Sequence, residues 1–306
     1  MTVLASGSKG NATVIAAGKT RLLVDAGLSC RELLRRLAAA GEDAGSLDAI
    51  LITHEHVDHI AGLAVLARRL RIPVFITEPT HRAWARALTP KTTMSYAKWL
   101  ELRQQEKQSV ENGSVQTMAA VAEEEAAEEP AVKADPTVLP VVEYFRAGQR
   151  FCIGEIDIEP FTIPHDAADP CGFVFHARSE SLRMAIATDL GYIPPNVKQA
   201  LREVDVLLLE SNHDLEMLKD GPYPWSVKQR VLSRVGHLSN TAAAEFLERD
   251  YDGGAHTIVL GHLSEQNNLP ELARLAAEQA VAGRMSLLGN RVLLAMQEKP
   301  LEPICL

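Results

Sequence analysis

Residues 54–59 read His-Glu-His-Val-Asp-His, and three imidazoles and two carboxylates therefore fall within six residues. The apolar run 47–53 comes directly before them and is typical of a buried strand, whereas the apolar run 60–70 directly after them is compatible with a helix. Imidazole nitrogens and carboxylate oxygens are metal donors. Open α/β sheets place their sites at the carboxyl ends of strands. This stretch therefore predicts a metal site at the end of a strand.

The spacing within the stretch favours two metals. Side chains alternate along extended backbone, so His54 and His56 project to the same side and can share one cation. Asp58 and His59 lie a turn further on, where a helix begins, and could bind a second cation. Two divalent cations roughly 3.5–4 Å apart can activate a water molecule and stabilise attacking and leaving oxygens. Such a site needs more donors than six residues supply.

Three residues further along the chain follow strand-like apolar runs, as His54 does: His165, Asp189 and His262. A single histidine after a strand is more often a surface residue or a hydrogen-bonded one than a ligand. Three such positions together with the motif favour ligation, because independent coincidence is improbable. Asp189 is the natural bridge, since a carboxylate has two oxygens for two cations.

Strands and helices alternate in two successive halves of the chain, which predicts an α/β layered fold. The pattern predicts helices over 30–40 with Ser29 as N-cap, and over about 60–71, 79–88, 194–203, 240–249 and 270–281. No hinge-like linker separates the halves, so we expect a single domain, 1–306. An acidic low-complexity segment at about 104–138 interrupts the rhythm and predicts a helical or disordered surface insertion. A docking segment for a basic partner is the alternative.

Composition narrows the class of protein. The formal net charge of −9 disfavours a nonspecific nucleic-acid binder with a large basic face, although a local basic groove remains compatible with it. No apolar run approaches the roughly 18 residues of a membrane span, and the first residues do not resemble a secretory leader. Four cysteines without paired spacing indicate a reducing compartment. We therefore expect a cytoplasmic protein without a membrane partner, and the sequence indicates no protein partner.

The stretch 54–59 resembles the HxHxDH signature of the metallo-β-lactamase fold superfamily of hydrolases. The resemblance covers nearly the whole chain outside the acidic segment and includes Asp25. It implies a four-layer αβ/βα sandwich, in which two mixed β-sheets carry helices on their outer faces and a dinuclear site, usually zinc, lies between the sheets. It implies these ligand sets: His54, His56 and His165 for one metal, Asp58, His59 and His262 for the other, and Asp189 as the bridge. Asp25 would orient a ligating histidine.

Four further motifs, at 6–11, 210–214, 236–240 and 262–268, resemble the YycJ/WalJ-type proteins. That group is regarded as DNA-directed exonucleases or phosphodiesterases, related to the ribonucleases that trim transfer-RNA 3′ ends. In those ribonucleases a glutamate and a later histidine handle a proton at the phosphate, and the matching positions are Glu210 and His237. A histidine oriented by a carboxylate can protonate a leaving oxygen. Glu210 could instead be a buried acid held by backbone donors, and the role of His213 stays open.

We therefore predict a dinuclear-metal-dependent phosphodiesterase, a 5′-exonuclease on DNA, in which a metal-bound hydroxide attacks phosphorus. The expected catalytic residues are Asp58, which is also a ligand, Glu210 and His237. The histidine-rich ligand set suits zinc, and its carboxylates also admit manganese or iron. Two alternatives remain. The same site could hydrolyse a small thioester, lactam or lactone, or the chain could be a binding or signalling protein with a degenerate site. The filled ligand positions argue against the second alternative.

Overall fold

The computed structural model describes residues 1–88, 137–282 and 291–306. The chain divides into two compact units, Met1–Arg86 with Leu139–Leu306, and Ala87–Val138. Nearly all of the acidic segment expected at 104–138 lies outside the described residues. The surface insertion and the single domain therefore stay predictions. The description below concerns the larger unit.

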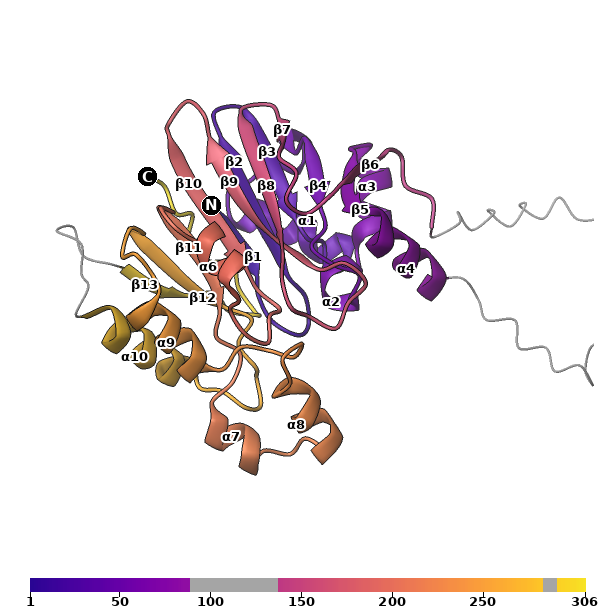
Figure 1. Cartoon of the computed structure of the whole chain (residues 1–306). Helices are drawn as coiled ribbons and strands as arrows, with labels where there is room; N and C mark the ends of the chain where they lie inside the picture. Colours follow the sequence, from indigo (N-terminus) through magenta and orange to yellow (C-terminus); the bar gives the residue numbers. More distant parts are fainter. Residues whose placement is uncertain (89–136, 283–290) are drawn as a thin grey trace, which may run out of the picture. The chain divides into compact units, whose positions relative to one another are not determined.

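Two mixed β-sheets form the centre of this unit (Figure 1). The first runs in the order β1 (Thr2–Ala5), β2 (Ala12–Ala17), β3 (Thr20–Val24), β4 (Ala49–Leu51), β5 (Val74–Thr77), β6 (Val142–Phe145). The second runs in the order β13 (Arg291–Leu294), β12 (Thr257–Gly261), β11 (Val206–Glu210), β10 (Leu182–Ala187), β9 (Cys171–Ala177), β8 (Ile156–Thr162), β7 (Phe151–Ile153). Each sheet is antiparallel on one side and parallel on the other, with the change at β3 and at β10.

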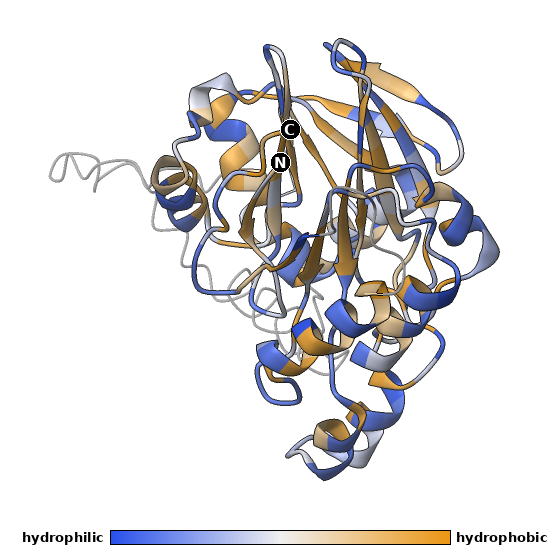
Figure 2. Ribbon diagram, turned by 90° about the vertical axis from the view of Figure 1, so that its left-hand side faces the viewer, coloured by the Kyte–Doolittle hydropathy of each residue, from blue (hydrophilic) through white to orange (hydrophobic). Residues whose placement is uncertain are grey.

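Strand β3 shows why the sheets are covered on both faces. Leu22 and Val24 belong to the apolar cluster between the two sheets, which also contains Phe173 and Leu208 of the second sheet. Leu23 points the other way, into a cluster with Leu33 of a covering helix. Strands buried on both faces read as continuous apolar runs, as these do. Figure 2 shows the same distribution, with largely hydrophobic strands at the centre.

Helices cover the outer face of each sheet. The elements before β6 are α1 (Cys30–Ala39), η1 (Ala44–Ser46), α2 (Val57–Ile60), α3 (Leu63–Leu70) and α4 (Glu78–Leu88). Those after β10 are α6 (Pro195–Ala200), α7 (Leu215–Asp220), α8 (Trp225–Val231), α9 (Asn240–Arg249) and α10 (Pro270–Val281). Of these, α6, α9 and α10 contribute to the apolar cluster on the outer face of the second sheet. Helix α1 begins as predicted, because the Ser29 side chain accepts a hydrogen bond from the Glu32 amide. Within the described ranges no helix is long and apolar enough to cross a membrane.

The layers confirm the predicted fold class. Three apolar clusters separate helices, sheet, sheet and helices, which gives the four-layer αβ/βα sandwich. The helix predicted over about 60–71 is wrong at its start, since α2 ends at Ile60 and α3 begins only at Leu63. The Gly62 amide donates to the Ala26 carbonyl at 2.8 Å and not to a carbonyl of the preceding turn, and a Cβ at Gly62 would lie 2.1 Å from the Leu28 carbonyl oxygen. Strand β6 and helices α7 and α8 were not predicted.

The predicted site residues follow the ends of strands from both sheets. Asp25 follows β3, and Asp189 and His262 follow β10 and β12. These three residues have φ values of 62°, 62° and 54°, in the left-handed region. Such backbone costs about 1–3 kcal/mol per residue and is concentrated at functional sites. The strand ends therefore hold these side chains in unusual but defined directions.

Candidate metal centre

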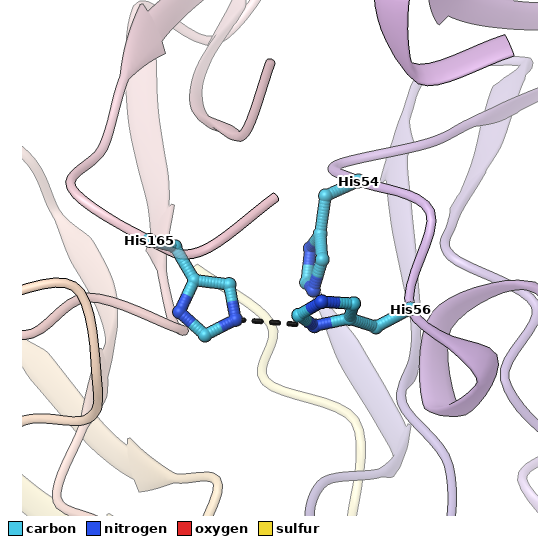
Figure 3. Close-up of side chains that lie close together, drawn as sticks. All are labelled: His54, His56 and His165. Atoms are coloured by element: carbon cyan, nitrogen blue, oxygen red, sulfur yellow. Dashed lines mark hydrogen bonds between the residues drawn. The ribbon is translucent and has the colours of Figure 1, made fainter. Parts of the chain in front are cut away.

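His54, His56 and His165 form the first group of candidate ligands. Each can place a ring nitrogen within 4.8 Å of the others, although His165 comes from a different sheet. Figure 3 shows the three rings pointing toward one another, with His56 Nδ1 3.2 Å from His165 Nε2. His165 Nδ1 donates to the Gly236 carbonyl at 3.2 Å, which fixes the ring. The first ligand set predicted from sequence is therefore assembled.

Asp58, His59, Asp189 and His262 form the second group, again with donor atoms within 4.8 Å of one another. His59 Nε2 lies 3.3 Å from Asp189 Oδ2. His262 Nε2 lies 3.4 Å from Asp58 Oδ2 and 3.4 Å from Asp189 Oδ1. Both oxygens of Asp189 thus face histidines of this group, and its role as a bridge to the first group stays a prediction. Metal binding by all seven residues stays a prediction that this geometry supports.

Carboxylates orient the histidines of the second group. His59 Nδ1 donates to Asp25 Oδ2 at 2.8 Å, and His262 Nδ1 donates to Glu210 Oε1 at 3.0 Å. Both contacts leave Nε2 directed at the centre of the group. Such an outer carboxylate fixes the tautomer and raises the basicity of a ligating imidazole. Asp25 is thus placed as the resemblance implied.

Two buried polar atoms without hydrogen-bond partners bear on whether cations fit in this centre. Among the described residues, His54 Nε2 and Asp189 Oδ2 are buried and have no hydrogen-bond partner. Buried polar atoms are nearly always satisfied, so unpaired ones need a ligand, an ion or a water molecule. Imidazole nitrogens and carboxylate oxygens suit divalent zinc, manganese or iron. The donors present therefore fit a dinuclear divalent site, in agreement with the predicted cofactor class.

The candidate ligands strongly shift one another's pKa values. Burial by itself lowers the pKa values of His59 and His262, but the Asp189 carboxylate and its neighbours raise them well above the usual range. Burial raises the pKa of Asp189, yet the charges of His262 and His59 take it well below its usual range. Burial, followed by the nearby His59, lowers the pKa of His54 well below the ordinary value. Metal binding requires neutral imidazoles and ionised carboxylates, so cations bound here would compete with protons for the same donors.

Glu210 and His237 lie beside both groups. His237 Nδ1 donates to Glu210 Oε1 at 2.8 Å, and the His237 ring centroid lies 5.2 Å from that of His165 and 5.1 Å from that of His262. Glu210 Oε2 accepts from the backbone amides of Leu190 and Leu238. Burial raises the pKa of Glu210, but His237 and His262 lower it to about 2. The carboxylate contacts His237 as well as two backbone amides, and a role in proton handling stays a prediction.

Several supporting residues were not assigned a role from the sequence. Asn11 Nδ2 lies 3.1 Å from His59 Nε2 and 3.3 Å from Asp58 Oδ2. Thr53 donates through Oγ1 to Asp25 and lies 3.0 Å from His54 Nδ1. Polar residues in loops follow no periodic pattern. Only the position of Asn11 in the motif 6–11, and of Thr53 directly before the motif 54–59, could have indicated their roles.

Comparison with known proteins supports the assignment of class. A model of the metallo-beta-lactamase superfamily matches residues 5–262. The exodeoxyribonuclease WalJ of Streptococcus pneumoniae serotype 2 (strain D39) is 35% identical over 280 residues, which are 92% of this chain and 87% of WalJ. The exodeoxyribonuclease YycJ of Bacillus anthracis is 34% identical over 279 residues, 91% of this chain and 88% of YycJ.

A solved structure shares the fold. The metallo-beta-lactamase fold protein YhfI from Bacillus subtilis matches with a TM-score of 0.61 over 98% of this chain and 99% of YhfI, at 17% sequence identity. The chain belongs to the metallo-β-lactamase superfamily and, within it, to the family of WalJ and YycJ. The resemblance drawn from the motifs is confirmed.

Proposed function

We propose that the protein is a dinuclear-metal-dependent phosphodiesterase that degrades DNA as a 5′-exonuclease. Two relatives that match over about nine-tenths of this chain are named exodeoxyribonucleases. The ligand groups of the site suit hydrolysis in general. The contact that favours a phosphodiester over other substrates is the hydrogen bond between Glu210 and His237.

His237 has the geometry of a proton donor to a leaving oxygen. Its side chain is 21% exposed, whereas Glu210, which accepts its Nδ1 hydrogen, is fully buried. The contact leaves Nε2 free of Glu210 and able to reach substrate beside the candidate ligands. A phosphodiester must expel an alkoxide, so a nearby imidazolium stabilised by a carboxylate accelerates cleavage.

The residues divide the reaction between them. Two divalent cations, when bound, would lower the pKa of a water molecule and offset charge on the phosphate. Asp58, at the rim of the ligand groups, orients the water and takes its proton. The water oxygen forms a bond to phosphorus, and the bond from phosphorus to the leaving oxygen breaks. His237 passes a proton from Nε2 to that leaving oxygen while Glu210 holds Nδ1.

Zinc is the metal that we propose, because five of the seven candidate ligands are histidines. Manganese and iron suit the carboxylates of the second group. We also propose a cytoplasmic location, since all four cysteines are free.

The test is cleavage of DNA labelled at either end by protein reconstituted with Zn²⁺ or Mn²⁺. We expect mononucleotides to be released first from 5′-phosphorylated ends. His54→Ala, which removes a buried ligand, should lower the rate at least a hundredfold at equal metal. A trace of cleavage that is the same in wild type and His54→Ala would sink the proposal, because it would come from a contaminant.

His237→Ala separates this function from hydrolysis of a small thioester, lactam or lactone at the same site. General acid catalysis contributes about 10²–10⁴-fold, so we expect that loss on DNA. Ester or lactone hydrolysis that survives in His237→Ala, in protein without nuclease activity, would favour the small-molecule function. Fewer than one metal equivalent per chain after reconstitution would favour a degenerate site.

A further inference from the structure

Residues 221–236, which we call the α8 arm, carry three basic residues and no acidic one. The basic residues are Lys228, Arg230 and Arg234. The whole chain has a net charge of −9, so this is a local concentration of positive charge in an acidic protein. Figure 1 shows α7 and α8 apart from the helices that cover the sheets.

Backbone contacts fix the α8 arm beside the candidate metal centre. The Val235 carbonyl accepts from the Asp166 amide at 3.1 Å, and the Gly236 carbonyl accepts from His165 Nδ1 at 3.2 Å. Arg230 Nε donates to Asp166 Oδ2 at 2.5 Å. The arm continues directly into His237. Its position relative to the scissile bond is therefore set by the same residues that build the site.

Two guanidinium groups of the arm suit a phosphate backbone. The Arg230 side chain is 59% exposed and uses Nε for Asp166, whereas a guanidinium has five N–H donors. Arg234 is exposed and lies over the Tyr192 ring, 4.4 Å from its centroid. Tyr192 follows Asp189 by three residues, so this stacked pair is also close in sequence to the predicted bridging ligand. Arginine forks match phosphate oxygens well.

The arm also exposes a large aromatic side chain. Trp225 is 67% exposed at the start of α8, and Leu232, about two turns further along at the end of that helix, is 47% exposed. A bare indole on a positively charged element is the combination that binds single-stranded nucleic acid, because a base can stack on the ring while phosphates meet the basic groups. In a duplex the base faces are already stacked on one another. The observations thus favour a single strand as the occupant.

We infer that the α8 arm binds the single strand of DNA next to the cleavage site, with Arg230 and Arg234 at backbone phosphates and Trp225 stacked on a base. The inference rests on the proposed nuclease function and adds its substrate form. A protein with this arm engages a frayed or single-stranded end and processes a blunt duplex more slowly.

Steady-state cleavage of single-stranded DNA tests the inference, with bis(p-nitrophenyl) phosphate as a small phosphodiester that lacks bases. For Trp225→Ala we expect the ratio of kcat/KM on DNA to kcat/KM on the small ester to fall about fivefold or more, mainly through KM. Trp225→Phe should restore most of this loss. For Arg234→Gln the dependence of binding on salt should weaken by about 0.7 in log–log slope, the value for one phosphate on a single strand.

Arg150→Gln is the matched control, because Arg150, directly before β7, is also largely exposed and lies outside the α8 arm. Kinetics of Trp225→Ala on DNA that equal those of Arg150→Gln would overturn the inference. So would a change of oligomeric state in Trp225→Ala on gel filtration, which would assign the exposed residues to self-association. Hydrolysis of the small ester without binding or cleavage of DNA by wild type would instead refute the proposed function itself.

Discussion

One carboxylate oxygen, Glu210 Oε1, accepts hydrogen bonds from two histidines with different predicted roles. His262 is a candidate ligand and His237 the candidate proton donor. A change at Glu210 therefore alters the site in two ways at once, and only a titration with metal separates the effect on ligand orientation from that on proton transfer. The sequence indicated Glu210 and His237 through motifs, but their shared oxygen follows only from the meeting of β11, β12 and the α8 arm.

His213 shows what an unpaired buried group does to stability. Among the described residues its two ring nitrogens have no hydrogen-bond partner, and burial lowers its pKa to about 4. The unfolded chain takes up this proton below about pH 6.5, whereas the folded chain does not until about pH 4. Stability from His213 is therefore present above pH 6.5 and is lost as the pH falls toward 4, by about 3 kcal/mol in total.

We expect His213→Asn to abolish that part of the pH dependence. The free energy of unfolding, measured by urea denaturation in chelator at pH 7 and at pH 4.5, should fall less in the variant by about 2–3 kcal/mol. The comparison cancels the other histidines, which both proteins share. Identical pH dependence in the two proteins would mean that His213 is satisfied in solution.

At the scale of elements, the sequence predicted the helices and strands that depend on residues close together in the chain. Ser29 indicated the start of α1, and the apolar runs predicted the central strands. The break at Gly62 and the edge strand β6 depend on packing partners far away in sequence, and β6 is largely exposed. Helices α7 and α8 are only six and seven residues long, too short for a clear period. Asp214, which caps α7 through its side chain, was the available signal for that helix.

Gly27 joins three elements through close backbone contact. A Cβ there would lie 1.6 Å from the Asp58 carbonyl oxygen, and the Gly27 amide donates to the Asn11 carbonyl at 2.9 Å. Gly27→Ala must therefore displace the backbone that carries Asp58 and His59. Because ligand geometry is then lost, we expect metal affinity to fall about tenfold or more, the lower range for disturbed support of a site.

Isothermal titration with Zn²⁺ measures that loss. Gly254→Ala is the control, since the nearest atom to its added Cβ is a side-chain oxygen of Asp252 at 3.3 Å, far less obstructive than the backbone. Equal affinities in the two variants would show that the loop after β3 can yield without moving the ligands.

For the whole molecule, the sequence predicted two successive halves from the alternation of strands and helices, and these correspond to the two sheets of the structure. The seven candidate ligands are divided between them: His54, His56, Asp58 and His59 follow β4, whereas His165, Asp189 and His262 follow strands of the second sheet. The sequence predicted this site because every ligand follows a strand end. It did not predict the backbone strain at Asp25, Asp189 and His262, which depends on how neighbouring strands meet.

Bound cations should therefore hold the two sheets together. Binding at a thousandfold excess over Kd stabilises the folded state by about 4 kcal/mol, and about 2–4 °C in Tm accompanies each kcal/mol at this size. We expect chelation to lower Tm by roughly 10 °C, measured by calorimetry before and after metal removal. His54→Ala, which removes one ligand, should show a smaller fall in Tm on chelation. An unchanged Tm on chelation of wild-type protein that is shown to contain metal would contradict the stabilisation of the two sheets by cations.

The division of ligands between early and late segments also has a consequence during translation. The ribosome delivers His54 and His56 first, but His262 emerges only after more than two hundred further residues. A nascent chain therefore holds only a partial set of donors until His262 has emerged. Because the proposed hydrolysis uses both groups, it cannot begin before the segment that carries His262 has been made and has folded.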